Sequence, residues 1–128
     1  MAKGMQQLLS EARARIQEID TESAAAETAS RPDTLVLDVR EGEEYAQGRI
    51  PGALLIPRGV LEPKAAADSP ARDSQLGDPA RPIIVYCGSG ARSALAAVTL
   101  QELGFRNVRS MAGGFQAWSR EDRVVERD

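Results

Sequence analysis

Residues 83–93 constrain the fold more than any other part of the chain. They begin with the run IIVY, whose β-branched and aromatic side chains are typical of a strand buried on both faces. A turn containing Gly88 and Gly90 follows, and an alanine- and leucine-rich run then predicts a helix to Leu103. A buried strand that leads through a tight loop into a helix indicates a parallel sheet covered by helices.

The same alternation of strand and helix signals runs through the rest of the chain. Strands are expected at residues 34–39, 53–56 and 105–111, and short helices begin near residues 41 and 115. Residues 20–29 read as a helix capped by Asp20 or Thr21, and an amphipathic helix precedes it. Residues 16–19 either end that first helix or form an edge strand. Residues 58–81 are rich in proline and small side chains, which predicts a surface loop with one helical turn, either a lid or a disordered insertion. The predicted class is α/β, with a mostly parallel central sheet flanked by helices on both faces.

Composition excludes several kinds of function. The 128 residues include no histidine and one cysteine, so Cys–His and Ser–His catalysis, thiolate zinc clusters and an internal disulfide are all ruled out. The net charge of −3 gives no support for nucleic acid as a partner, and no apolar run is long enough for a membrane span. We therefore expect a cytoplasmic protein with no metal, no cofactor, no nucleic acid and no membrane among its partners.

Cys87 stands where the predicted strand ends and the loop begins. Backbone N–H groups of such a loop, and of the helix N-terminus after it, can converge on a negative charge, first a thiolate and then a bound anion. Gly88 and Gly90 allow the necessary curl, and Arg92 adds a positive charge. A buried structural thiol is the alternative reading of Cys87, but it gives no reason for the Gly-Ser-Gly sequence that follows. We interpret Cys87 as a nucleophile.

With these segments placed, the chain resembles a single-domain rhodanese, a sulfurtransferase. Four motifs carry the resemblance, and it is their order and spacing that make it specific. They are residues 37–40 (LDVR) with Glu44 and Tyr45, residues 48–53 (GRIPGA), residues 87–93 (CGSGARS), and residues 113–115 (GGF) with Trp118. Arg49 departs from the histidine that is common in the second motif, a change that leaves the chemistry intact because this residue mainly shapes a turn.

The resemblance implies a rhodanese-like sandwich and a division of the chain. Residues 1–15 would be a helical extension, residues 16–118 the rhodanese domain and residues 119–128 a charged, solvated tail. Cys87 would take a sulfane sulfur from a donor such as thiosulfate, hold it as a persulfide, and pass it to cyanide or a thiol. The loop would bind the substrate through Gly88, Ser89, Gly90, Ala91, Arg92 and Ser93. Asp38 and Arg40 would brace the loop, and Arg92 would either bind an anionic donor or pair with Asp38.

Three alternatives stay open on the same fold. A cysteine phosphatase or arsenate reductase would use the same cysteine, but cysteine phosphatases place one residue more between cysteine and arginine. Only four residues separate Cys87 from Arg92, which suits a sulfur atom better than a tetrahedral oxyanion. A non-catalytic binding module often lacks the cysteine. The protein could also be a persulfide carrier that serves a partner enzyme, or it could pass sulfur to a thioredoxin-like or other sulfur-accepting protein. These functions would use the same loop as a free-standing enzyme.

Overall fold

Five short strands form one sheet in the computed structural model, which describes residues 2–128. The order across the sheet is β1-β5-β4-β2-β3, and every pair of neighbours runs parallel. The strands are β1 (Gln17–Ile19), β2 (Leu35–Asp38), β3 (Leu54–Leu55), β4 (Ile83–Tyr86) and β5 (Val108–Met111). The expectation of a mostly parallel sheet is confirmed. Because parallel strands share one carboxyl edge, the loops after β2, β4 and β5 gather at the same edge of the sheet.

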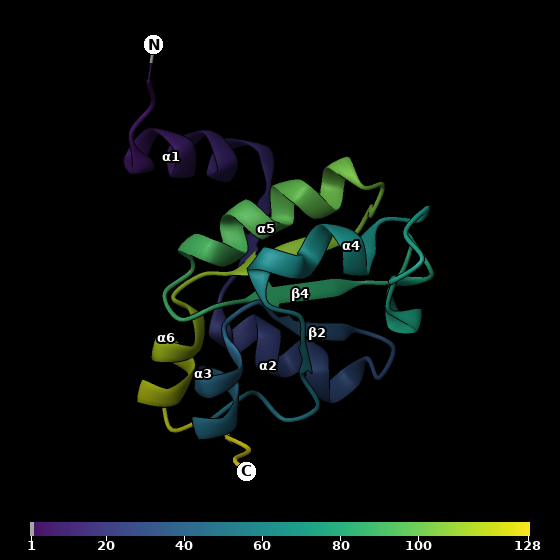
Figure 1. Cartoon of the computed structure of the whole chain (residues 1–128). Helices are drawn as coiled ribbons and strands as arrows, with labels where there is room; N and C mark the ends of the chain where they lie inside the picture. The colour runs from purple at the N-terminus through teal and green to yellow at the C-terminus, as the bar shows by residue number, and fades with distance from the viewer. Residues whose placement is uncertain (1) are drawn as a thin grey trace.

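Helices cover both faces of this sheet (Figure 1). On one face lie α1 (Met5–Arg15), α4 (Leu61–Ala65) and α5 (Ala91–Glu102), and on the other lie α2 (Thr21–Ser30), α3 (Gly42–Gln47) and α6 (Gly114–Arg120). Among residues 2–128, no helix has the length and apolar character needed to cross a membrane.

Alternate residues of each central strand enter two separate cores. In β4, Val85 belongs to the core beneath α4 and α5, whereas Ile84 belongs to the core beside α2 and α6. The first core also takes Leu37 and the second takes Val36, both from β2. Burial on both faces explains why these strands read as continuous apolar runs in the sequence.

The N-terminal segment resolves the choice left by its sequence. Residues 17–19 form the edge strand β1, which pairs with β5, and do not extend the helix. Helix α1 packs beside α5, but only its Ala12 is buried. Met5 and Leu8 remain 54% and 42% exposed, so much of the predicted apolar face does not enter the core.

Residues 58–81 are more regular than a surface loop. They contain the 3₁₀ turns η1 (Arg58–Val60) and η2 (Ser74–Leu76), with α4 between them. Leu61, Ala65 and Leu76 from this segment are buried in the core beneath α4 and α5. The helical turn expected in this segment is confirmed by α4, whereas the expectation of a disordered insertion is wrong, because the segment contributes to the core.

The last residues return to the domain and are not simply solvated. The backbones of Arg49 and Glu126 exchange two hydrogen bonds of 2.9 Å in an antiparallel bridge. The Arg49 guanidinium also pairs with the carboxylates of Glu126 at 3.2 Å and Asp128 at 2.7 Å, and Val125 packs against the second core. Arg49, where the chain departs from the motif, therefore holds the end of the chain, while the side chains of Glu126 and Asp128 remain 50% and 65% exposed, as expected of a solvated tail.

Candidate active site

The sulfur of Cys87 lies inside the loop that connects β4 to α5. The side chain is fully buried, and its Sγ accepts hydrogen bonds from the backbone N–H of Gly90 at 3.1 Å and of Ser93 at 3.4 Å. Gly90 has φ of 107°, a left-handed conformation that glycine adopts without steric cost. This turn directs the amides inward, as the glycine pattern predicted.

Two buried hydroxyls continue from the sulfur toward the sheet. Ser93 Oγ lies 3.5 Å from Cys87 Sγ, and the same Oγ lies 2.8 Å from Ser110 Oγ in β5. Both serines are completely buried. Sequence reasoning missed Ser110, because β5 also contains Arg109 and nothing in its pattern marks the serine as buried.

These contacts act on the ionisation of Cys87 in opposite directions. Burial raises the pKa of the thiol, because the thiolate loses hydration. The Ser93 hydroxyl and the backbone N–H groups of Ser93, Gly90 and Ser89 stabilise the thiolate, and together they bring the pKa of Cys87 below its ordinary value. The loop therefore favours the nucleophilic form of the sulfur.

Arg92 pairs with Glu44 and not with Asp38. The guanidinium donates to both carboxylate oxygens of Glu44, at 2.9 and 3.1 Å. This pair, assisted by the backbone N–H of Glu41, lowers the pKa of Glu44 to about 2 although partial burial opposes it. The predicted bracing of Arg92 by Asp38 is wrong, and the acid that does pair with Arg92 comes from α3.

Asp38 instead pairs with Arg40 beneath the loop. Arg40 Nη2 lies 2.8 Å from Asp38 Oδ2 and also donates to the carbonyl of Gly48 at 2.7 Å. Its guanidinium carbon stands 4.4 Å from the centre of the Phe115 ring and 5.5 Å from that of Tyr86. Arg40 therefore ties the end of β2 to the residue before Cys87 and to α6.

Helix α6 holds the outer side of the loop by its backbone. The N–H of Phe115 donates to the carbonyl of Cys87 at 2.8 Å, and that of Gln116 donates to the carbonyl of Gly88 at 3.0 Å. Gly114 has φ of 59°, and a Cβ at this position would lie only 2.6 Å from both of those carbonyl oxygens. The close approach of the two backbones therefore requires glycine at residue 114.

The remaining predicted loop residues form the rim of the site. Gly88 is half-buried and lies against Arg92, since a Cβ at residue 88 would be 3.2 Å from Arg92 Nη2. Ser89 is exposed at the tip of the loop, and Ala91 is the first residue of α5. Of the six predicted loop residues, Gly90 and Ser93 therefore contact the sulfur of Cys87, and Arg92 is turned to Glu44.

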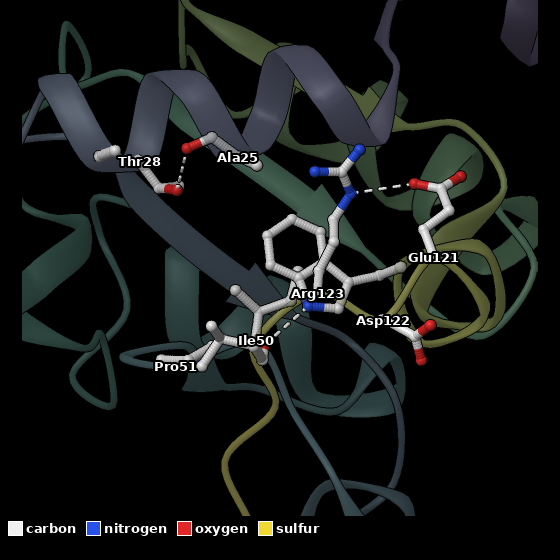
Figure 2. A pocket seen from close by; sticks show the side chains of 10 residues that line it. Ala25, Thr28, Ile50, Pro51, Glu121, Asp122 and Arg123 are labelled. Atoms are coloured by element: carbon white, nitrogen blue, oxygen red, sulfur yellow. Dashed lines mark hydrogen bonds and ion pairs between the residues drawn. The ribbon is translucent and has the colours of Figure 1, made fainter.

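A large cavity lies elsewhere, on the face of the sheet covered by α2 and α6 (Figure 2). Its volume is about 560 Å³, and Trp118, Ile50 and Pro51 contribute to its wall. Arg123 Nε donates a hydrogen bond of 2.9 Å to Glu121 Oε1. Figure 2 draws this contact as a dashed line beside the cavity. No residue of the Cys87 loop lines it, so it is separate from the candidate active site.

Comparison with known proteins identifies the family. The model of the rhodanese-like domain matches residues 21–121. The chain belongs to the rhodanese-like family. A sulfurtransferase of Allochromatium vinosum is 37% identical over 105 residues, which cover 82% of this chain and 90% of that relative.

Two solved structures show the same rhodanese fold. One, from Rhodopseudomonas palustris, is described as a protein of unknown function and a possible tyrosine phosphatase. It is 33% identical, has a TM-score of 0.92, and the match covers 98% of this chain and 96% of that one. The other is the polysulfide-sulfur transferase homodimer of Wolinella succinogenes, which is 28% identical with a TM-score of 0.76, over 95% of this chain and 86% of that one. The same fold thus occurs in one protein described as a possible phosphatase and in another described as a sulfur transferase.

Proposed function

We propose that this rhodanese-like protein transfers sulfane sulfur through a persulfide on Cys87. The observation that carries the proposal is the set of loop donors on Cys87 Sγ, which includes the N–H groups of Gly90 and Ser93. Such a loop stabilises a sulfur anion without a base, and the chain has no histidine to act as one. The sulfurtransferase from Allochromatium vinosum supports the same chemistry.

The reaction has two balanced steps. The Cys87 thiolate attacks the outer sulfur of thiosulfate, a new S–S bond forms, and the S–S bond of thiosulfate breaks so that sulfite leaves with the electron pair. Cyanide or a thiolate then attacks the outer sulfur of the persulfide, and the Cys87 thiolate leaves. The chain contains no second cysteine, so an outside acceptor, either a small molecule or a thioredoxin-like protein, must discharge the persulfide.

We give the other predicted residues supporting roles in this reaction. Residues 88–93 enclose the space beside the sulfur and stabilise the charge of the donor and of the persulfide. Asp38 and Arg40 hold the strand end and α6 against this loop by the contacts described above. Neither of these two residues touches Cys87 Sγ in the structure, so we assign them a bracing role.

The length of the loop separates this proposal from phosphatase chemistry. Four residues separate Cys87 from Arg92, one fewer than a cysteine phosphatase requires. Both terminal nitrogens of Arg92 are held by Glu44, and this pair opposes the binding of thiosulfate as much as that of a phosphate, so it favours neither reaction. The shorter loop favours sulfur transfer in spite of the description of the Rhodopseudomonas palustris protein.

Mass spectrometry of the intact protein tests the proposal. Incubation with thiosulfate should add one sulfur, about 32 Da, which dithiothreitol removes. The loaded protein should release thiocyanate when cyanide is added, whereas Cys87→Ser should do neither. Hydrolysis of aryl phosphates by the native protein, without any sulfur adduct, would overturn the assignment in favour of a phosphatase.

A further inference from the structure

Ser110 is a buried hydroxyl that the loop chemistry described so far does not use. It lies in β5, paired in register with Val85 of β4, two residues before Cys87. Arg109 and Met111, on either side of it, face α2 or the second core, so Ser110 faces the opposite side, toward α5. Its Oγ lies 2.8 Å from Ser93 Oγ and has no other side-chain or backbone partner among the described residues.

The hydrogen-bonding groups of Cys87, Ser93 and Ser110 suit the thiolate better than the thiol. Two contacts connect the three side chains, one between Cys87 Sγ and Ser93 Oγ and one between Ser93 Oγ and Ser110 Oγ. With a thiolate there are two hydroxyl hydrogens for two contacts, so Ser110 donates to Ser93 and Ser93 donates to sulfur. With a neutral thiol there are three hydrogens for the same two contacts, and one is left without an acceptor in a fully buried place.

Ser110 determines which way the Ser93 hydroxyl points. A serine in the first turn of a helix can also turn its hydroxyl to a nearby backbone carbonyl. A hydrogen bond received from Ser110 occupies one lone pair of Ser93 Oγ and strengthens the bond that Ser93 donates onward. Because Ser110 is held in a central strand, its position does not depend on the loop.

We propose that Ser110 is a positioning residue for the nucleophile, which acts by directing the Ser93 hydroxyl at Cys87 Sγ. The proposal rests on the proposed function only in taking Cys87 as the nucleophile. Around the sulfur, the charged groups are Arg92 from α5, its partner Glu44 from α3, and the Asp38–Arg40 pair after β2. These four groups are unchanged in the serine variants, so they do not account for a difference between them.

The test is the rate of alkylation of Cys87 by iodoacetamide as a function of pH, which needs no sulfur donor. In Ser110→Ala, we expect the midpoint of the profile to move to higher pH and alkylation at pH 7 to slow about two- to tenfold, since a charge-assisted hydrogen bond is weakened. Ser93→Ala should show a larger shift in the same direction. Thr99→Val is the matched control, because it removes a hydroxyl from α5 that bonds Arg58 and not the sulfur; its profile should stay native.

The double variant Ser93→Ala with Ser110→Ala distinguishes positioning from packing. If Ser110 acts through Ser93, the double variant should have the same profile as Ser93→Ala alone. An unchanged pH profile in Ser110→Ala would overturn the proposal. So would a double variant whose midpoint is shifted from that of Ser93→Ala by as much as Ser110→Ala is shifted from the native protein. If Ser110→Ala shifts the midpoint in the native protein but not in Ser93→Ala, the positioning role is supported even when no persulfide is detected. The positioning role of Ser110 and the proposed sulfur transfer can therefore fail separately.

Discussion

Substitution of Gly114 by alanine would measure how much the close contact between α6 and the Cys87 loop contributes to stability. The added Cβ would lie 2.6 Å from the carbonyl oxygens of Cys87 and Gly88, far inside an ordinary contact distance of about 3.5–4.0 Å. Both neighbours are backbone atoms, so no side chain can rotate away. Either α6 must move outward or the first two residues of the loop must move inward.

The free energy of unfolding should fall for two separable reasons. A residue with a Cβ at φ of 59° costs roughly 1–2 kcal/mol, and forced overlap in a packed interior costs roughly 1–3 kcal/mol more. Gly52→Ala isolates the first cost, because Gly52 has φ of 79° and no atom within 4 Å of its added Cβ. We expect Gly52→Ala to lose roughly 1–2 kcal/mol and Gly114→Ala roughly 2–5 kcal/mol.

Urea unfolding of both variants and of the native protein supplies the free energies, and iodoacetamide supplies the reactivity of Cys87. Gly114→Ala should also alkylate more slowly at pH 7, because relief of the overlap displaces the loop whose amides stabilise the thiolate. Gly52→Ala should alkylate at the native rate. Equal free energies of unfolding in the two variants, or native reactivity in Gly114→Ala, would refute the role given to this contact.

Three other predictions follow from the charges around the site. Glu44→Gln should free Arg92 and lower the KM for thiosulfate about two- to fivefold in steady-state assays, the scale of a partly exposed ion pair; an unchanged KM would mean that Arg92 does not meet the donor. Asp38→Asn leaves Arg40 buried opposite a neutral group and should cost roughly 3–5 kcal/mol in urea unfolding, whereas a loss below about 1 kcal/mol would contradict the buried pair. Because the pKa of Cys87 is lower in the folded protein than in the unfolded chain, the stability advantage of the native protein over Cys87→Ser should be complete above the unfolded pKa and disappear as the pH falls through the folded one. Urea unfolding of both proteins between about pH 6 and 10 measures this difference, and an advantage that shrinks as the pH rises would have the wrong sign.

The features that sequence predicted well are those decided by near neighbours in the chain. Strand β4 is buried on both faces, so its residues are apolar without interruption. The donors to Cys87 lie within six residues of it, at Gly90 and Ser93. A strand, a glycine turn and a helix start therefore contain most of the information needed to place Cys87 among its hydrogen-bond donors.

The features that sequence missed depend on contacts between distant segments. Glu44 and Arg92 are 48 residues apart in the sequence and form an ion pair only because α3 packs beside the Cys87 loop. Ser110 reaches Ser93 because β5 lies beside β4, which a serine in a strand does not reveal by itself. Leu61 and Leu76 anchor residues 58–81 at points too sparse to give a periodic pattern.

The strand order also sets when the surroundings of Cys87 can be completed during synthesis. Strand β5 lies between β1 and β4, so the first strand made has no partner until the fifth has emerged. The helix that binds the carbonyls of Cys87 and Gly88 is made later still. A ribosome-bound chain that ends before α6 thus carries its only thiol without a finished loop around it. A chain that ends before residue 114 therefore lacks both hydrogen bonds that hold the carbonyls of the Cys87 loop, so these contacts can form only after nearly the whole chain has been made.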